Sequence, residues 1–352
     1  MITISICMIV KNESSVLARC LDTIADLCDE IIIVDTGSTD NTKEIAARYT
    51  DKIYDFEWID DFSAARNFSF SKATCDYIYA PDADEVLDEI NRAEFRKLKE
   101  CMLPEIEIVQ MKYRTVGVDT VLNVADEYRP KLFKRLREFT WVDPIHETVR
   151  LDPVVFDSDV VITHMPESDH SARDFGVFEK AVARDGYLSS RVSLMYATEL
   201  YKCGTKTDLE NALTYFEELW QSENKKLSEA SSCVLARFAR LCGDSVTLMK
   251  LGLKAMSGSD PASEICFETG SFFYEQGDLD EAINWFNNAL TASRPVLDVH
   301  KSGDEAYEML NVCYDRLATV FKDTPAGDDY RKLAVHYLSE KCNWKMPEET
   351  GF

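Results

Sequence analysis

Short apolar runs of strand length alternate with helical patterns over residues 1 to about 165. Residues 3–10 (TISICMIV) and 30–35 (EIIIVD) are largely apolar and rich in β-branched side chains, which is typical of strands buried on both faces. Residues 51–58 and 76–80 supply two further strand-like runs. Helical patterns lie between the runs, at 15–28, 41–49 and 61–73. This alternation predicts parallel strands in a sheet covered by helices on both faces.

Polar side chains directly follow three of these runs. They occupy residues 11–13, 35–40 and 82–85. Ligands of such sheets bind at the carboxyl ends of the strands, and neighbouring parallel strands end at the same edge. The three polar groups are therefore expected to meet on one rim of the sheet.

The third polar group is an acidic cluster in the stretch DYIYAPDADEVLDEI. Asp82 and Asp84 are two residues apart after a strand, so an extended backbone would point both carboxylates to the same side. Such oxygen ligands suit Mn²⁺ or Mg²⁺, which could in turn hold a diphosphate. The alternative is that these residues only cap a surface helix over 86–100, where acidic side chains favourably meet the helix dipole.

Four segments resemble family 2 glycosyltransferases in their order and spacing: SICMIVKNE (5–13), EIIIVDTGSTDNT (30–42), FSAARNFS (62–69) and YAPDADEVL (79–87). The resemblance covers roughly residues 3–165 and implies a GT-A fold, an α/β Rossmann-like mixed sheet with helices on both faces. It further implies a metal-dependent, inverting transfer from a nucleoside-diphosphate sugar, with a UDP-sugar favoured. The acceptor would be a glycan, a lipid, or a protein or peptide.

The resemblance assigns nucleotide-sugar binding to residues along the rim: Val10, Asn12, Glu13, Asp35, Arg66 and Asp82. Asp35 would accept a hydrogen bond from the base or ribose, and Arg66 would face the nucleotide or its phosphates. Asp84 would bind the metal directly, with Asp82 near the metal and the ribose. Asp40 is interpreted as a cap of the next helix. For Arg66, the alternative is an arginine on a helix surface.

Two histidines and three carboxylates complete the candidate site. The segment WVDPIHETV resembles the family's I-H-E segment and contains His146, and His164 follows another strand-like run. Either histidine could join the metal shell as a neutral imidazole ligand. Glu147 is the favoured general base for the acceptor's proton, and Glu85 and Asp143 are its rivals.

From about residue 174 onward the pattern is helical throughout. Residues 262–276 and 277–290 read as two amphipathic helices joined by a Gly-Asp turn, and 208–220 reads as a diverged copy of the second helix. The copies are about two units of 34 residues apart, the period of the tetratricopeptide repeat. The segment resembles that repeat at its small and aromatic positions, which are Gly270, Tyr274, Gly277, Ala282 and Ala289.

We therefore expect two domains, a GT-A glycosyltransferase domain over 1–172 and a helical repeat domain over 173–352. Stacked repeats would offer a concave surface that holds the acceptor. An irregular helical bundle is the alternative architecture for this part.

Composition limits the partners and the compartment. With 63 acidic against 39 basic residues and a net charge of −24, nucleic acid and anionic membranes are disfavoured. A phosphorylated ligand would need local cations or a metal. Eleven scattered cysteines without a C-x-x-C pair favour reduced thiols in a cytoplasmic protein. The sequence contains no apolar run near the ~20 residues of a transmembrane helix, and we expect no signal peptide.

Two other functional classes are the alternatives to a glycosyltransferase. A nucleotidyltransferase would usually carry a Gly-rich phosphate loop early in the chain, and residues 8–18 contain no glycine. The second is a repeat-based scaffold with a degenerate, non-catalytic front domain. It is favoured by Thr36, where many family members have a second acidic residue, and disfavoured by the intact D-x-D and Arg66.

Overall fold

The computed structural model describes residues 1–115, 127–135, 141–149, 153–165, 171–257 and 261–347. The chain divides into two compact units, Met1–Gly186 and Tyr187–Phe352. The predicted boundary at 172/173 lies close to this division, at the start of a helix that belongs to the first unit. The extent of the functional domains stays a prediction.

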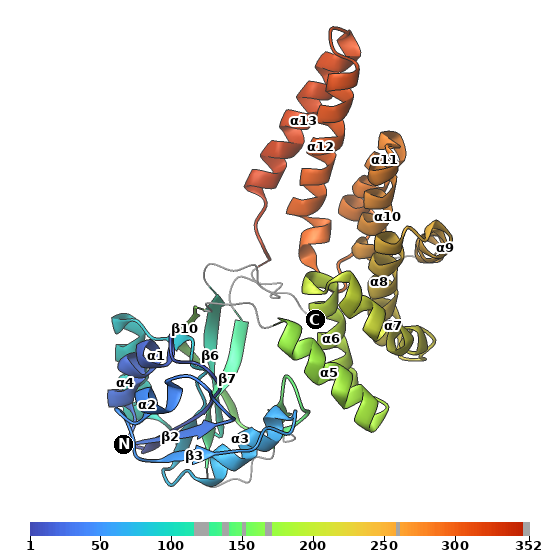
Figure 1. Cartoon of the computed structure of the whole chain (residues 1–352). Helices are drawn as coiled ribbons and strands as arrows, with labels where there is room; N and C mark the ends of the chain where they lie inside the picture. Colours follow the sequence, from blue (N-terminus) through green and yellow to red (C-terminus); the bar gives the residue numbers. More distant parts are fainter. Residues whose placement is uncertain (116–126, 136–140, 150–152, 166–170, 258–260, 348–352) are drawn as a thin grey trace. The chain divides into compact units, whose positions relative to one another are not determined.

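The first unit is an α/β unit (Figure 1). Its strands are β1 (Ile4–Val10), β2 (Glu30–Asp35), β3 (Ile53–Asp55), β4 (Tyr77–Tyr79), β5 (Glu85–Val86), β6 (Ile108–Thr115), β7 (Glu127–Lys134), β8 (Trp141–Val142), β9 (Thr148–Val149) and β10 (Val155–His164). Its helices are α1 (Leu17–Ile24), with the 3-10 turn Ala25–Leu27, α2 (Thr42–Ala46), α3 (Phe62–Ser71), α4 (Glu89–Cys101) and α5 (Ser171–Asp185).

Within the described residues the main sheet has eight strands in the order β3-β2-β1-β4-β7-β6-β10-β5. The four strands expected from the sequence, β3, β2, β1 and β4, are parallel to one another. β7 runs antiparallel to both β4 and β6, and β10 pairs parallel with β6. The sheet is therefore mixed, as the GT-A resemblance implies. A separate two-stranded sheet joins β8 and β9.

Helices cover both faces of this sheet because successive strand side chains point to opposite sides. Ile6 and Met8 of β1 pack in one core with side chains of α1, α2 and α4. Cys7, between them in sequence, packs in the other core with Phe70 of α3. The apolar face predicted for the first helix is buried in full: Val16, Leu17, Cys20, Leu21, Ile24 and Leu27.

Glu30 is a buried carboxylate at the amino end of β2. It accepts hydrogen bonds from Ser5, from Lys52 at 2.6 Å and from the Thr74 amide at 2.8 Å. Burial acts to raise its pKa, but Lys52, Ser5 and Thr74 lower the pKa to about 2. Three segments of the front unit are thus joined through one side chain.

The substitution Glu30→Gln should destabilise the protein by roughly 2 kcal/mol at pH 7, because it removes the charge from a buried network. The pKa of Glu30 is depressed on folding, so its contribution is complete above the unfolded value of about 4.5 and is lost as the pH falls toward 2. The difference in stability between wild type and variant should therefore shrink over that range. Urea melts at several pH values measure it, with the exposed Glu44→Gln as control. A difference that is constant with pH would contradict this account.

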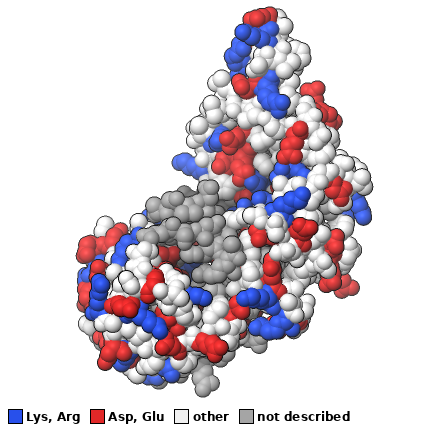
Figure 2. Space-filling view, in the orientation of Figure 1, with Lys and Arg blue, Asp and Glu red and all other residues white. Residues whose placement is uncertain are grey.

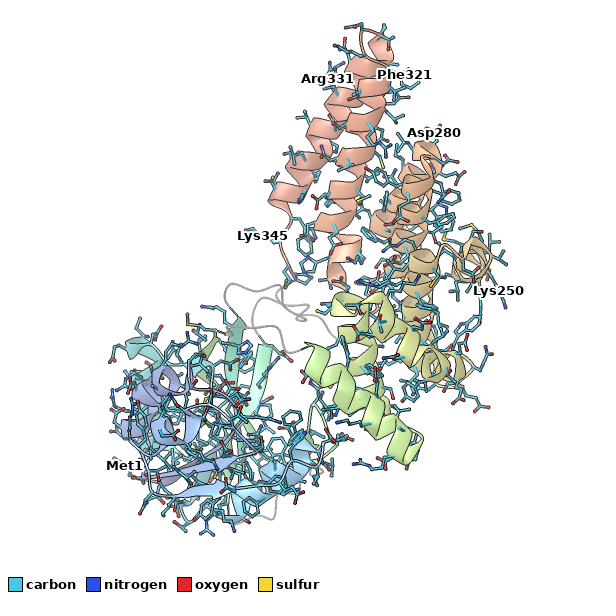
Figure 3. The ribbon with its side chains drawn as sticks, in the orientation of Figure 1. Met1, Lys250, Asp280, Phe321, Arg331 and Lys345 are labelled. Atoms are coloured by element: carbon cyan, nitrogen blue, oxygen red, sulfur yellow. The ribbon has the colours of Figure 1, made fainter. Side chains whose placement is uncertain are left out.

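In its described residues the second unit is built of helices, with one isolated β-bridge between Ala262 and Arg294, which confirms the predicted fold class. Its helices are α6 (Ser190–Cys203), α7 (Lys206–Trp220), α8 (Lys225–Cys242), α9 (Ser245–Met256), α10 (Ser263–Gln276), α11 (Leu279–Thr291), α12 (Asp304–Val320) and α13 (Pro325–Asn343). Figure 3 shows Lys250 on α9, whose Nζ lies 5.6 Å from the centroid of the Trp220 ring. In the described part of the chain, no helix combines the length and the apolar character needed to cross a bilayer.

A Gly-Asp junction recurs in this unit. Gly277 has φ +83°, and Asp278 caps α11 by accepting from the Glu281 amide. Gly243 has φ +69°, and Asp244 caps α9 in the same way. The two glycines are 34 residues apart, one tetratricopeptide period. The α8–α9 pair therefore supplies a repeat between the two predicted copies, 208–220 and 277–290, within the repeat domain expected over 173–352.

The segment between α11 and α12 departs from a regular repeat. The Glu264 carboxylate on α10 accepts hydrogen bonds from the consecutive amides of Val296, Leu297 and Asp298. Leu297 and Asp298 are buried. This connection is therefore packed against the first helix of the preceding pair.

Gly270 of α10 faces the Phe286 ring of α11, and a Cβ at this position would lie 2.9 Å from a ring carbon. We expect Gly270→Ala to lower stability by about 1–3 kcal/mol through overpacking. Gly252→Ala is the matched control, because its Cβ would make only ordinary contacts at 3.4 Å. Thermal melts of both variants check the prediction, and equal melting temperatures would refute it.

Candidate active site

The loops after β1 and β2 are bound to each other at the carboxyl ends of the strands. The Asn12 amide donates to the Ser38 hydroxyl at 2.9 Å, and the Asn12 carboxamide oxygen accepts from the Thr39 amide at 2.7 Å. The Glu13 amide donates to the Thr42 hydroxyl at 2.8 Å. Asn12 adopts φ +57° to make this approach. The structure therefore brings the predicted rim residues Val10, Asn12, Glu13 and Asp35 together.

Asp35 ends β2 and is fully buried. Its Oδ1 accepts from the Gly37 and Ser38 amides, both at 2.9 Å, and lies 3.8 Å from Lys43 Nζ. Its Oδ2 has no hydrogen-bond partner within the described residues. A buried acceptor without a partner is costly, so this oxygen is available for a ligand donor.

Asp40 has a structural role. Its carboxylate accepts from the amide and the hydroxyl of Thr42 in the first turn of α2, and from the Ser14 amide at 3.1 Å. Burial acts to raise its pKa, but Thr42 and Ser14 lower the pKa to about 2. The N-cap of α2 is Asn41, so Asp40 is not the cap that we expected but binds the first turn of the helix from the residue before the cap.

The acidic cluster after β4 forms a turn, and the expected extended backbone is wrong. The Glu85 amide donates to the Asp82 carbonyl at 3.2 Å, and residues 83 and 84 are turn residues. The side chains therefore reach different partners. The helix-cap alternative is also wrong for Asp82 and Asp84, because the cap of α4 is Asp88, which accepts from the Asn91 amide.

Asp82 and Glu85 both bind Lys131 of β7. Lys131 Nζ lies 3.2 Å from Asp82 Oδ2 and 2.5 Å from Glu85 Oε1. Burial raises the pKa of Glu85 to about 8, against the effect of Lys131. Burial also acts to raise the pKa of Asp82, but the charges of Lys131 and Arg66 lower it below its ordinary value. The pKa values of the two carboxylates are therefore shifted in opposite directions although both bind one lysine.

Arg66 lies on α3 and is 9% exposed, so it is not a surface arginine. Its Nε and Nη2 donate to Oε1 of Glu147 at 3.1 and 2.7 Å, and Nη2 lies 3.8 Å from Asp82 Oδ1. Its Nη1 is buried and has no hydrogen-bond partner within the described residues. Arg66 thus connects Glu147, the predicted base, with the acidic turn, and its Nη1 is available to donate a hydrogen bond to a ligand.

The two predicted histidines are placed differently. His164 ends β10, and its Nε2 lies 2.9 Å from Asp84 Oδ2. His146 adopts φ +49°, and its ring packs 5.7 Å from that of Phe178 on α5. Of the two, His164 is therefore the one paired with the predicted metal ligand.

Helix α3 holds the segment 141–147 that carries Glu147. The Asn67 carboxamide bonds both the amide and the carbonyl of Trp141, at 2.9 and 3.1 Å. The Phe62 amide at the start of α3 donates to the Pro144 carbonyl at 2.8 Å. Trp141 is buried, and its ring packs against those of Phe70 and Phe133. Asp143, the rival base, lies in the same segment with φ +73°.

Sequence reasoning missed Lys131 and Asn67. Lys131 was missed because the strand EYRPKLFK, with its proline and charged residues, does not read as a buried strand. Asn67 directly follows Arg66 in the FSAARN segment. This position next to a predicted site residue was the only indication in the sequence that Asn67 belongs to the site.

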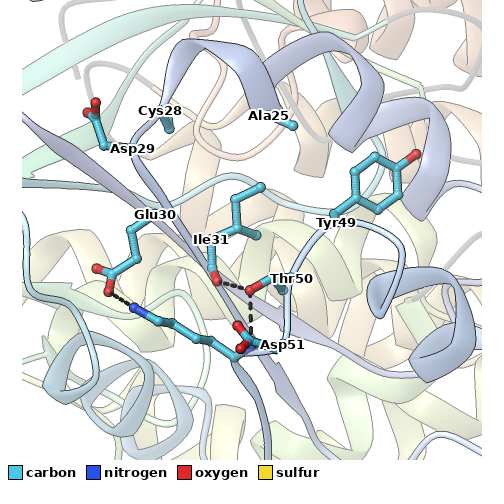
Figure 4. A pocket seen from close by; sticks show the side chains of 9 residues that line it. Ala25, Cys28, Asp29, Glu30, Ile31, Tyr49, Thr50 and Asp51 are labelled. Atoms are coloured by element: carbon cyan, nitrogen blue, oxygen red, sulfur yellow. Dashed lines mark hydrogen bonds and ion pairs between the residues drawn. The ribbon is translucent and has the colours of Figure 1, made fainter.

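On the face seen in Figure 2, acidic and basic side chains are interspersed. A pocket lined by Cys28, Glu30, Tyr49 and Lys52 among others lies at the amino end of β2 (Figure 4). It is at the opposite end of that strand from Asp35 and is not part of this site.

Residues 5–145 match the family described as Glycosyl transferase family 2. The chain contains a family 2 glycosyltransferase domain. A TPR repeat-containing protein of Synechococcus elongatus is 29% identical over 321 residues, covering 86% of this chain and 69% of that protein. The SPbeta prophage-derived glycosyltransferase SunS of Bacillus subtilis is 38% identical over 98 residues, which are 27% of this chain and 23% of SunS. This chain therefore matches less than a quarter of the length of SunS.

Among solved structures, glucosyl-3-phosphoglycerate synthase of Mycobacterium tuberculosis aligns with a TM-score of 0.40 and 18% identity, covering 54% of this chain and 82% of that chain.

Proposed function

We propose that this glycosyltransferase transfers a sugar from a UDP-sugar, with inversion and with Mn²⁺ or Mg²⁺, to a glycan, lipid, protein or peptide acceptor. The observation that carries the proposal is the pairing of Asp84 with His164 at 2.9 Å, in the turn whose Asp82 lies 3.8 Å from Arg66. A carboxylate and an imidazole from distant parts of the chain meet where the donor diphosphate is expected.

The donor set fits a divalent ion. Asp84 and His164 together offer a carboxylate oxygen and an imidazole nitrogen, which Mn²⁺ accepts. The described residues contain no group of three or more His, Cys, Asp or Glu side chains that could hold a metal. The donor phosphates would supply further ligands, as is common for Mg²⁺. When bound there, the ion would stabilise the departing diphosphate by Lewis acidity.

The chain's own residues bind and orient the reactants. Asp35 Oδ2, buried and available, accepts a hydrogen bond from the base or the ribose. Arg66 Nη1 donates to the donor's phosphates or ribose. Val10, Asn12 and Glu13 line the nucleotide. Because these hydrogen-bonding side chains are already held in place, they need not reorganise as negative charge develops on the departing diphosphate.

Glu147 is the proposed general base. Its described contacts with Arg66 use Oε1, so Oε2 is the oxygen that takes the acceptor's proton. The attacking oxygen or sulfur then forms a bond to the anomeric carbon as the bond to the diphosphate breaks. Glu85 is less suited to this role, because its Oε1 is bound to Lys131 and its side chain is 2% exposed.

Calorimetric titration of UDP into the full chain tests the donor assignment. Binding is expected with Mn²⁺ and is expected to be lost with EDTA, and ADP and GDP are the comparison ligands. Binding that is unchanged by EDTA would contradict the metal assignment. Failure of every nucleotide to bind in either buffer would favour the non-catalytic scaffold.

We also propose that the stacked helix pairs hold the acceptor. Support comes from the 34-residue recurrence of the Gly-Asp junction and from the TPR repeat-containing relative. Incubating cell extract with labelled UDP-sugars and the protein, followed by mass spectrometry, identifies the labelled acceptor. A labelled acceptor that is a small molecule would contradict this role of the helices.

A further inference from the structure

Lys131 is a buried cation placed against the acidic turn by strand pairing. Its strand β7 runs antiparallel to β4, and the Lys131 carbonyl accepts from the Ala80 amide at 2.9 Å. Its side chain, 7% exposed, reaches past Ala80 to Asp82 and Glu85. One residue therefore holds the backbone before the turn and two carboxylates within it.

The contacts of Asp82 use both of its oxygens. Oδ2 accepts from Lys131 at 3.2 Å, and Oδ1 lies 3.8 Å from Arg66 Nη2. Asp82 itself is half-exposed, but a divalent ion placed on it would lie next to two largely buried cations, Lys131 and Arg66, which would repel the ion. Asp84, two residues on, instead contacts His164 at 2.9 Å. The two aspartates of the D-x-D pair thus have different electrostatic surroundings.

We propose that Lys131 is a positioning residue of the active site. It holds Asp82 against β7 and so orients the turn, leaving Asp84 with His164 to take the divalent ion. The inference rests on the proposed metal-dependent donor binding. It divides the acidic pair into an anchored member, Asp82, and a metal-binding member, Asp84.

A purely structural role is the competing explanation. Glu85 is 2% exposed, and Lys131 could serve only to neutralise it. Removing one member of a buried ion pair is strongly destabilising in either case. Loss of stability in Lys131→Met therefore does not separate the two explanations, so Lys131 is replaced together with Glu85, its partner at 2.5 Å.

The experiment compares Lys131→Met/Glu85→Gln with Glu85→Gln alone, each as the full chain. The readout is the Mn²⁺ concentration that gives half-maximal UDP binding in calorimetry, with the melting temperature as a check of folding. We expect the double variant to fold but to need about 10–100 times more Mn²⁺ than Glu85→Gln, the usual effect of removing a group that orients a metal ligand. Lys131→Arg should restore most of the wild-type Mn²⁺ requirement.

An equal Mn²⁺ requirement in the double variant and in Glu85→Gln would overturn the proposal and leave Lys131 as a counter-charge for Glu85. If methionine prevents folding, Lys131→Gln/Glu85→Gln keeps a hydrogen bond across the pair and is read in the same way. Wild-type protein is titrated first. If it binds UDP without a divalent ion, or does not bind UDP at all, the proposed function itself fails, and this result differs from a failure of the Lys131 inference alone.

Discussion

Replacing Asp84 with asparagine should reduce donor turnover by about 100-fold or more, the usual size of effect when a group that stabilises developing charge is removed. Asparagine has nearly the same shape and can still hydrogen-bond His164, which lies 2.9 Å from Asp84 Oδ2 in the native protein. It lacks the charge that a divalent ion requires. The loss should therefore appear in Mn²⁺-dependent UDP binding and in UDP release from UDP-sugars, while the melting temperature changes little.

The matched control is Glu89→Gln, which removes one negative charge from the same acidic stretch. Glu89 lies in the first turn of α4, with its side chain 86% exposed and paired with Arg92. It should leave UDP binding unchanged. Full Mn²⁺-dependent UDP binding by Asp84→Asn would show that Asp84 is not a metal ligand.

The second large effect is expected for Arg66→Met. This change leaves Glu147 without the guanidinium that donates to it at 3.1 and 2.7 Å, and it removes a cation 3.8 Å from Asp82. Loss of one partner from a largely buried ion pair costs about 3–5 kcal/mol. We therefore expect a large fall in the melting temperature together with loss of UDP binding.

Arg66→Lys separates charge from geometry. Lysine keeps the positive charge but not the planar fork that binds Glu147 through two nitrogens, so it should recover stability more than UDP binding. Arg48→Met, at an exposed position after α2, controls for loss of an arginine in general. If the Arg66→Met variant folds and binds UDP as tightly as the wild type, Arg66 is not part of the donor site.

Local sequence patterns were sufficient to predict the strands of the parallel half of the sheet. The apolar runs at 3–10 and 30–35 became β1 and β2 almost without change, because strands buried on both faces must be continuously apolar. The polar residues after them had to lie on one rim, since neighbouring parallel strands end together. In the helical unit, Gly277 and Asp278 predicted the α10–α11 turn, because a left-handed residue followed by a helix cap is a local requirement.

Local sequence patterns did not predict the antiparallel half of the sheet. The segment 127–134 carries a proline and several charges, and nothing in its own order shows that it inserts between β4 and β6. The helix expected over residues 86–100 was also predicted to start too early. Residues 85 and 86 pair with β10 as a short strand, and α4 begins only after Asp88.

The sequence by itself determined which residue types stand at the rim and that a helical repeat region follows. The tertiary structure decided which of them meet: Asp84 with His164 across 80 residues, Arg66 with Glu147 across 81, and Lys131 with Asp82 across 49. The physical reason is that hydrophobic periodicity reports only how each segment is buried, whereas these ion pairs depend on strand order and register. Strand order and register are set by the packing of the whole sheet.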